Sequence, residues 1–353
     1  MWGVHEDDHE RGRPCEQSCG RPRGQPHHAQ EQESTVLGPL GHTDLRPGRR
    51  TALTLGAGAA LAVALPAAQA SASVSASASA SASAGTAGLA RRFRALEEEY
   101  AARLGVYAYD TATGRSVRYR ADETFALCSV FKTLAAGAVL RDLDRNGEFL
   151  AKRIRYTEQQ VTDSGYAPVT GRPENLADGM TVEALCAAAV SESDNCAGNL
   201  LLSELGGPTG ITRFCRSLGD RTTRLDRWEP DLNSAEPWRT TDITTPHAIG
   251  RTYARLLLGR ALPDADRERL TGWLIANTTN GERFGTGLPD DWTLADKTGG
   301  GASYGVANDV GVAWPPGRPP LLLAVLSTKK DPAGPTENAL VARAAAQVAA
   351  ALT

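Results

Sequence analysis

Sequence patterns typical of β-strands occur at the two ends of residues 87–353, and the stretch between them is helical and rich in loops. Strand-like runs stand at 106–109, 116–119, 292–297, 306–314 and 321–327. Runs rich in Ala and Leu stand at 133–142, 182–190, 196–205 and 247–258, and an Ala-rich helix closes the chain from about residue 336. This order predicts a two-lobe α+β fold. Residues 87–124 and 276–353 would form an antiparallel sheet flanked by terminal helices, with an all-α lobe inserted at 125–275 and a site in the cleft between the lobes.

The predicted sheet lobe begins with an amphipathic helix. Large apolar or aromatic residues recur there at helical spacing with charged residues between them: Leu89, Phe93, Leu96, Tyr100 and Leu104. Gly105 is expected to end the helix. The turn-forming residues 110–114 then predict a hairpin that joins the strands at 106–109 and 116–119.

Residues 1–48 are polar and rich in Gly, Pro, Arg and His, and no hydrophobic periodicity supports a core. They indicate a disordered segment or an over-extended gene start. A zinc cluster of His5, His9, Cys15 and Cys19 is disfavoured because the spacing fits no established finger.

Residues 49–70 have the features of an export signal. Arg49-Arg50 precedes a short run of small apolar residues that ends in Ala68-Gln-Ala70. A membrane-spanning helix is disfavoured because the run is short, and no cysteine follows the cleavage site to accept a lipid. We therefore expect secretion by the twin-arginine route, without a stable membrane anchor. Residues 71–86 alternate Ser and Ala and predict a linker.

The charge balance argues against polyanionic partners. Lys and Arg number 38 against 41 Asp and Glu, a formal charge of −3, so neither nucleic acid nor an anionic membrane is expected. We expect a monomer that acts on a small molecule.

Four cysteines lie beyond residue 86: Cys128, Cys186, Cys196 and Cys215. Because the twin-arginine route exports proteins already folded in a reducing cytosol, we expect free, buried thiols.

Histidine is scarce in the predicted folded region. Of the six histidines, only His247 lies beyond residue 86, at a predicted helix start with no partner signal for a Ser-His-Asp site. No metal site is expected in the folded region. Lysine and glutamate must then carry out any proton transfer.

Three short motifs contain groups suited to acyl transfer. Ser129 and Lys132 are three residues apart, so a helix beginning at Ser129 would place both on one face, where the amine can take the hydroxyl proton. The alternative is a helix N-cap beside a surface lysine. Ser193-Asp-Asn195 is also typical of a capping turn before a helix at 196, and Lys297-Thr-Gly299 of a strand end. Their joint occurrence in this order favours a catalytic site.

These motifs resemble those of the class A β-lactamases, active-site serine enzymes related to penicillin-binding proteins, and of actinomycete members in particular. The resemblance spans roughly residues 89–352. Further matching segments are Phe125-Ala-Leu-Cys-Ser129, Tyr166-Ala-Pro-Val-Thr170, Arg227-Trp-Glu-Pro-Asp-Leu-Asn233, Thr241-Asp-Ile-Thr-Thr-Pro246, and Asn308-Asp followed by Val-Ala-Trp-Pro-Pro316. The resemblance implies the serine β-lactamase fold, hydrolysis of a small β-lactam, and no cofactor.

The resemblance also implies the role of each residue. Ser129 would attack the lactam carbonyl, with the backbone N–H groups of Ser129 and Gly300 as the oxyanion hole. Ser193 would relay a proton to the lactam nitrogen. Lys132, crowded by Lys297 and Ser193 in a closed cleft, is expected to have a lowered pKa.

Substrate binding is implied for a second group of residues. Asn195 would hold the acylamide side chain, and Tyr166 would form a wall of the pocket. Lys297 and Thr298 match the carboxylate-binding residues of the family, and Arg283 resembles an additional arginine that some members place beneath that carboxylate.

Glu229 separates the two enzymatic interpretations. Glu229 and Asn233 are four residues apart and can hold one water between them, which provides a base for deacylation and therefore turnover. A D-Ala-D-Ala peptidase of the penicillin-binding type would lack this base, and a non-catalytic antibiotic sensor would be expected to lose Glu229 or Lys132. Whether Lys132 or Glu229 is the acylation base stays open. The resemblance further implies a cis Glu229-Pro230 bond.

The same resemblance implies features of the loop and of the substrate range. Arg227 and Asp242 would clamp the two ends of the loop that contains Glu229, rather than form a solvated pair. Some carbapenem-hydrolysing relatives have a disulfide from the residue matching Cys128, but Gly301 occupies the partner position here. Gly300-Gly-Ala302 lacks the hydroxyl-bearing residue that many broad-spectrum members have after Lys297-Thr-Gly299, so penicillins and earlier cephalosporins are expected. Alternatively, the extra glycines widen the pocket for bulky oxyimino groups.

Overall fold

The structure is a computed structural model that describes residues 87–301 and 303–353. The predictions for residues 1–86 therefore lie outside the described residues. Among those described, no helix is both long and apolar enough to cross a membrane.

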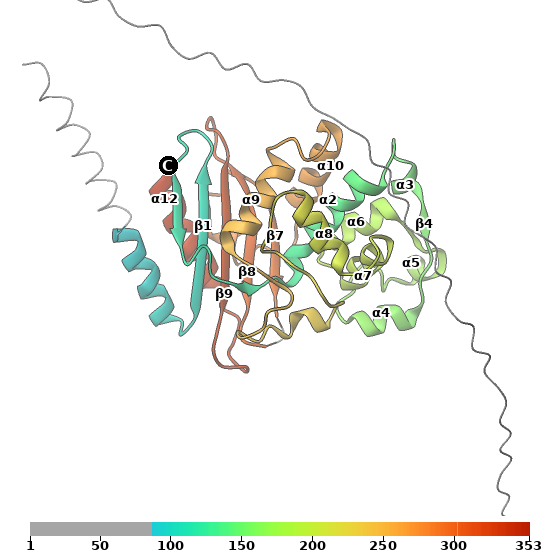
Figure 1. Ribbon diagram of the computed structural model, residues 1–353, viewed down its shortest axis with the longest axis horizontal. Coiled ribbons are helices and arrows are strands. Elements are labelled where there is room, and N and C mark those ends of the chain that lie inside the picture. The colour runs from blue at the N-terminus through green and yellow to red at the C-terminus, as the bar shows by residue number, and fades with distance from the viewer. Residues whose placement is uncertain (1–86, 302) are drawn as a thin grey trace, which may run out of the picture. The chain divides into compact units, whose positions relative to one another are not determined.

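A five-stranded antiparallel sheet forms one side of the protein, in the order β2-β1-β9-β8-β7 (Figure 1). Its strands are β1 (Arg103–Asp110), β2 (Ser116–Tyr119), β7 (Thr293–Gly300), β8 (Ala307–Trp314) and β9 (Leu321–Thr328). These are the five predicted runs, and 110–114 connects β1 to β2 as expected. Because β7 lies at the sheet edge, one side of its backbone has no strand partner within the described sheet.

The two terminal helices cover one face of the sheet. The first is helical from 87 to 99, and α12 (Asn338–Leu352) is the predicted Ala-rich helix. Leu89 and Phe93 share a buried cluster with Val341 and Val348 of α12.

The predicted extent of the first helix is wrong, because Leu104 and Gly105 lie in β1. Ala101 has a φ of 46°, a left-handed conformation that ends the helix before them. Gly105 has no room for a side chain, since a Cβ there would lie 2.5 Å from the Phe125 ring.

The other face of the sheet packs against α9 (Pro246–Leu257) and the helical lobe. Gly250 of α9 approaches so closely that a Cβ would lie 2.9 Å from the Tyr107 ring and 3.4 Å from Ala324. Thus α9 belongs to the packing of the sheet, although its residues fall within the range 125–275 expected of the inserted lobe.

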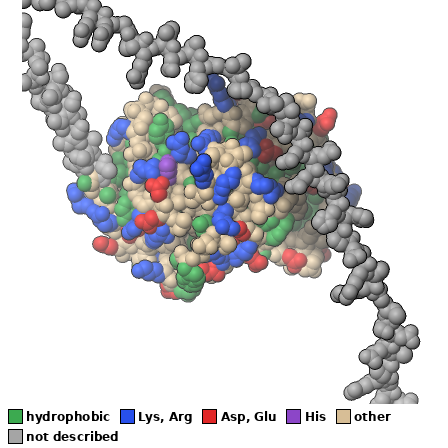
Figure 2. Space-filling view, viewed as in Figure 1, with side chains coloured by type: hydrophobic (Ala, Val, Ile, Leu, Met, Phe, Trp, Pro, Cys, Tyr) green, Lys and Arg blue, Asp and Glu red, His purple; other side chains and the backbone are tan. Residues whose placement is uncertain are grey.

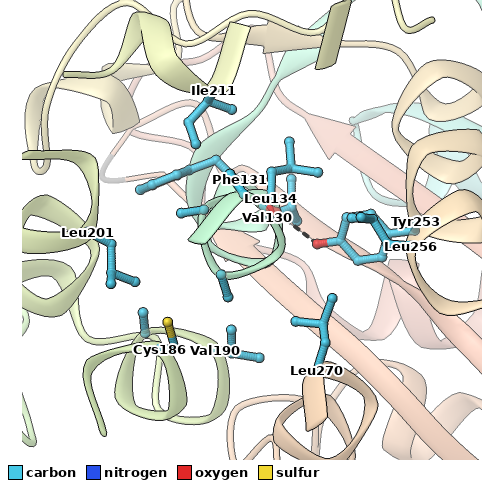
Figure 3. Close-up of a cluster of buried hydrophobic side chains, with 14 of the residues drawn as sticks. Val130, Phe131, Leu134, Cys186, Val190, Leu201, Ile211, Tyr253, Leu256 and Leu270 are labelled. Atoms are coloured by element: carbon cyan, nitrogen blue, oxygen red, sulfur yellow. Dashed lines mark hydrogen bonds between the residues drawn. The ribbon is translucent and has the colours of Figure 1, made fainter. Parts of the chain in front are cut away.

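Helix α2 (Phe131–Ala138) lies at the centre of the helical lobe, and all its residues are buried. Figure 3 shows Phe131 and Leu134 among side chains of α6 (Val182–Ser191), α7 (Asn195–Glu204), α8 (Thr209–Ser217) and α10 (Asp264–Ile275). The shorter elements are β3 (Phe125–Ala126), η1 (Cys128–Val130), η2 (Val139–Leu143), α3 (Glu148–Ala151), β4 (Arg153–Ile154), α4 (Glu158–Ser164), α5 (Pro173–Asp178), β5 (Met180–Thr181), η3 (Asp231–Ser234), β6 (Ile243–Thr244) and α11 (Phe284–Gly287). The buried centre places the start of α2 against β7.

All four cysteines of the described region are buried free thiols, as predicted. Burial raises the pKa of each thiol above its usual range. Cys128 and Gly301 form no bridge because the second position has no sulfur.

Candidate active site

Ser129 lies in η1, a single 3-10 turn that leads into α2. The helix expected to begin at Ser129 is therefore a 3-10 turn first and an α-helix only from Phe131. The turn still places Ser129 Oγ 3.0 Å from Lys132 Nζ. Cys128 has a φ of 46°, so the backbone just before Ser129 is left-handed. A non-glycine residue adopts this conformation only where its surroundings hold it.

Lys132 is fully buried among oxygen atoms. Its ammonium donates to the Ser193 carbonyl at 2.7 Å, to Asn195 Oδ1 at 2.6 Å and lies 3.1 Å from Glu229 Oε1. Burial lowers its pKa, and the Glu229 carboxylate opposes this. The predicted direction is confirmed, although burial rather than crowding by Lys297 is the main cause.

Gly198 makes room for the Lys132 side chain, which sequence reasoning missed. A Cβ at Gly198 would lie 3.1 Å from Lys132 Cε. Gly198 comes three residues after Asn195 on α7, so both face α2. That helical spacing is the signal by which Gly198 could have been found.

The 193–195 turn is both a cap and part of the site. Asp194 caps α7 by accepting from the Ala197 N–H at 2.8 Å, and it also accepts from the Thr170 N–H at 2.8 Å. Ser193 Oγ lies 3.4 Å from Lys132 Nζ. The capping interpretation therefore fits Asp194, while Ser193 and Asn195 face the lysine.

Tyr166 stands at the rim of this turn. Its side chain is 57% exposed, while its carbonyl accepts from the Asn195 N–H at 2.8 Å. Asn195 Nδ2 donates to the Ser164 carbonyl at 2.9 Å. The Asn195 amide thus bridges Lys132 and the segment that presents Tyr166.

Glu229 reaches Ser129 from a loop far along the chain. Its Oε1 lies 3.4 Å from Ser129 Oγ, and its Oε2 accepts from Asn233 Nδ2. The side chain of Asn199 on α7 holds both backbone groups of Glu229, accepting from its N–H and donating to its carbonyl at 2.9 Å each. Sequence reasoning missed Asn199, although it lies one helical turn after Asn195. The Glu229-Pro230 bond is cis, as expected.

The 227–242 loop is closed at its base. Arg227 Nε donates to Asp242 Oδ2 at 2.7 Å, and Asp242 Oδ1 accepts from the N–H of Asp226 at 2.8 Å and of Arg227 at 3.0 Å. Since Asp242 is buried, this is a charge-assisted clamp rather than a solvated pair.

Strand β7 contributes a second buried lysine. Lys297 Nζ donates to the Thr298 carbonyl at 3.0 Å, and burial, together with the charge of Lys132, lowers the pKa of Lys297 to about 7. A Cβ at Gly299 would lie 3.2 Å from Val130 Cγ1, so β7 packs directly on η1. Gly300 ends β7 and is exposed.

Arg283 lies beneath the end of β7. Its Nη1 donates to the carbonyls of Gly299 at 2.8 Å and Asn308 at 2.6 Å. Its Nη2 is 3.8 Å from the position a Cβ of Gly300 would occupy. The guanidinium therefore adds positive charge beside Lys297 and Thr298.

His247 is not part of this site. Its Nδ1 lies 2.9 Å from Asp122 Oδ1, and its half-buried side chain packs on the Tyr107 ring. Among residues 87–301 and 303–353, no three His, Cys, Asp or Glu side chains gather as metal ligands would. The proton-transfer groups near Ser129 are thus a lysine and a glutamate.

The positive charge of the site is internal. Figure 2 shows Lys and Arg side chains spread across one face with Asp and Glu between them, whereas Lys132 and Lys297 are both fully buried. Chemically, the arrangement offers a hydroxyl nucleophile, an amine and a carboxylate in contact with it, and cationic groups for an anionic substrate.

Asp296 and Asp309 form a buried carboxyl pair behind β7 that sequence reasoning missed. The two carboxyl groups lie close enough for each to shift the pKa of the other, and Asp309 Oδ2 accepts from the Phe284 N–H at 3.1 Å. Burial and the neighbouring carboxylate raise the pKa of Asp309, so the pair keeps one proton.

We expect Asp309→Asn to remove a pH-dependent loss of stability. A raised folded-state pKa contributes stability that is fully present below the unfolded pKa and is lost as pH rises through the folded pKa. Asparagine keeps a donor for Asp296 but cannot ionise. Urea unfolding should be measured from about pH 5 to about pH 9. Over this range the free energy of unfolding of the variant, relative to that of the wild type, should increase by about 1 kcal/mol or more, the equivalent of one pKa unit.

Asp110→Asn is the control, because the pKa of Asp110 is shifted in the opposite direction from that of Asp309. Asp110 is buried and accepts from Thr113 Oγ1 at 2.7 Å and the Ala112 N–H at 2.8 Å, and these hydrogen bonds lower its pKa. Its substitution should destabilise the protein at neutral pH. Identical pH profiles for Asp309→Asn and the wild type would contradict the shared proton.

Comparison with known proteins gives consistent matches. A model of the β-lactamase enzyme family matches residues 88–352. A β-lactamase of Kitasatospora aureofaciens is 67% identical over 311 residues, covering 88% of this chain and 99% of the relative. The solved β-lactamase from Streptomyces albus G superposes with a TM-score of 0.74 at 62% identity, covering 75% of this chain and 100% of that one. A β-lactamase structure from Desulfarculus baarsii superposes with a TM-score of 0.72 at 45% identity, covering 75% of this chain and 97% of that one.

Proposed function

The chain belongs to the β-lactamase enzyme family as an actinomycete class A serine β-lactamase, and we propose that it hydrolyses penicillins and cephalosporins through an acyl-enzyme on Ser129. The observation that supports this most directly is the position of Glu229. Its carboxylate contacts both Ser129 Oγ, at 3.4 Å, and Lys132 Nζ, at 3.1 Å. A base in that place can act on an ester formed at Ser129.

In the proposed acylation, Ser129 Oγ bonds to the lactam carbonyl carbon and passes its proton to Lys132 or Glu229. The N–H groups of Ser129 and Gly300 stabilise the oxyanion. As the C–N bond breaks, Ser193 gives a proton to the lactam nitrogen and recovers one from Lys132, which lies within 3.4 Å. Burial lowers the pKa of Lys132, which makes the release of its proton to Ser193 easier.

In the proposed deacylation, Glu229 and Asn233 hold a water over the ester. Glu229 takes a proton from the water, whose oxygen bonds to the ester carbon. The C–O bond to Ser129 then breaks, and Ser129 Oγ takes the proton that Glu229 received from the water, across the 3.4 Å that separates it from Glu229 Oε1. The hydrogen bond between Glu229 and Asn233 and the contacts of Asn199 with the Glu229 backbone hold both side chains in place, which supports this assignment. A D-Ala-D-Ala peptidase would have no use for such a buried carboxylate.

Substrate recognition is proposed at two ends of the site. Lys297, Thr298 and Arg283 would bind the carboxylate, since their charge and hydrogen-bonding groups converge at the end of β7. Asn195 would hold the acylamide group beside Tyr166, sharing the Nδ2 that now donates to Ser164.

Gly301 bears on the substrate range. A Cβ there would lie 3.0 Å from the Asn233 carbonyl and 3.3 Å from Ala235 Cβ. The glycine thus lets the 227–242 loop approach β7 closely, which supports penicillins and earlier cephalosporins over bulky oxyimino drugs.

Side chains and backbone N–H groups supply every proposed chemical step, so we propose no cofactor. We further propose a monomer, secreted by the twin-arginine route.

A steady-state assay of the purified chain with a chromogenic cephalosporin tests the proposal. We expect sustained hydrolysis, many product molecules for each enzyme molecule. Ser129→Ala is the control and should give none. A single burst equal to the enzyme concentration would instead indicate a peptidase or a sensor that stops at the acyl-enzyme.

A further inference from the structure

Tyr253 reaches from α9 to the turn that contains Ser129. Its side chain is fully buried, and its hydroxyl donates to the Val130 carbonyl at 2.8 Å (Figure 3). Val130 directly follows Ser129 and immediately precedes α2. The hydrogen bond therefore connects a helix on the sheet to the backbone of the proposed nucleophile.

The turn that Tyr253 contacts has little support of its own. No side chain caps the N-terminus of either η1 or α2. Cys128, the residue before Ser129, is left-handed with a φ of 46°. Such a conformation persists only where the surrounding structure holds it.

Several contacts hold residues 127–130 from outside, including the packing of Cys128 with Ala235 and Val306. Three further contacts come from Asp242, β7 and α9. The Leu127 N–H donates to the Asp242 carbonyl at 2.8 Å, and Gly299 of β7 packs against Val130 and Cys128. The third contact is the Tyr253 hydroxyl. The first two come from segments that also contribute to the proposed site, whereas Tyr253 belongs to neither.

The Tyr253 hydroxyl is suited to this role because it stays a donor. Burial raises the pKa of Tyr253 well above its ordinary value, so the phenol remains protonated. The ring packs within the same buried cluster as Val130 and Leu134. Because water is excluded, no solvent molecule replaces the hydroxyl when it is removed.

We propose that Tyr253 is a positioning residue whose hydroxyl fixes the 128–130 turn, so that Ser129 Oγ stays aligned with Lys132 for attack on the substrate. The inference rests on the proposed function of Ser129 as nucleophile. Acylation depends on this alignment, whereas noncovalent binding at β7 does not.

The test compares Tyr253→Phe with its parent in a Glu229→Ala background, where each enzyme molecule reacts once. Adduct formation with benzylpenicillin is followed by rapid quench and mass spectrometry. We expect the acylation rate to fall about 5- to 100-fold, between the loss of one hydrogen bond and a displacement of the nucleophile by about 1 Å. The drug concentration for half-maximal rate should stay unchanged.

Tyr156→Phe is the matched control. The Tyr156 hydroxyl also donates to a backbone carbonyl, that of Thr170, at 3.1 Å, and the residue is buried. Both variants should lose stability to denaturant, but only Tyr253→Phe should acylate slowly. Replacing Tyr253 by para-aminophenylalanine, which restores a donor, should recover most of the rate.

Each other outcome is decisive. Wild-type acylation by Tyr253→Phe, equal slowing by Tyr156→Phe, or a folded para-aminophenylalanine protein that stays slow would overturn the role of Tyr253. Should Tyr253→Phe fail to fold, the acylation rate of the para-aminophenylalanine protein decides whether the donor at this position is what matters. Failure of the protein with Glu229 intact to hydrolyse benzylpenicillin would instead overturn the proposed function itself.

Discussion

Glu229→Ala is expected to stop turnover while leaving Ser129 able to react. The substitution removes the proposed base for the deacylating water, and a general base typically contributes about 10²–10⁴-fold. Glu229 also raises the pKa of Lys132, so its loss leaves the lysine more readily neutral and able to accept the serine proton. Hydrolysis should fall by at least that order, and mass spectrometry after mixing with benzylpenicillin should show the intact drug on the peptide containing Ser129.

Two further variants separate base chemistry from loop damage. Glu229→Gln keeps the shape of the side chain but not its basicity, and should behave like Glu229→Ala. Glu236→Ala changes a carboxylate of the same loop that pairs with Arg239 and should retain hydrolysis. Unmodified protein with unchanged hydrolysis in Glu229→Ala would rule out Glu229 as the base and with it the class A route.

Lys132→Arg is expected to lower the acylation rate by about 10²–10⁴-fold, the usual contribution of a general acid–base group. Arginine keeps the positive charge but does not release its proton in proteins, so it cannot accept that of Ser129. The rate of adduct formation in the Glu229→Ala background measures this step separately from deacylation.

Lys329→Arg provides the comparison for Lys132→Arg. Lys329 is also buried and pairs with Glu337 at 2.7 Å, but it contacts no proposed catalytic group. The Lys329→Arg protein should be acylated at the wild-type rate. If Lys132→Arg did so as well, the proton-transfer role of Lys132 would be wrong.

Much of the fold could be predicted because its elements are encoded locally. The strand at 321–328 begins with a continuous apolar run, Leu321–Leu326, and helices α2 and α6 have Ala-rich sequences. The end of the first helix could not be predicted this way. Leu104 continues the helical spacing of Leu96 and Tyr100, but the left-handed Ala101 and the crowding at Gly105 place it in a strand.

The sequence by itself determined which residues contain the reactive groups. Ser129 and Lys132 are close in sequence, as are Glu229 and Asn233, so short-range geometry alone places each pair together. Tyr253 gave no such local signal, because it lies 123 residues from Val130. Asn199 shares a helix face with Asn195, but its partner Glu229 lies 30 residues away.

Only the tertiary structure decided how these pairs meet and what their protonation states are. Glu229 reaches Ser129 across 100 residues of sequence. Burial lowers the pKa of both Lys132 and Lys297, and the charge of Lys132 lowers that of Lys297 further. Desolvation and charge interactions depend on distances in the folded protein, not on spacing along the chain. Local sequence therefore specified the helices, strands and reactive side chains, while long-range packing set the environment in which they act.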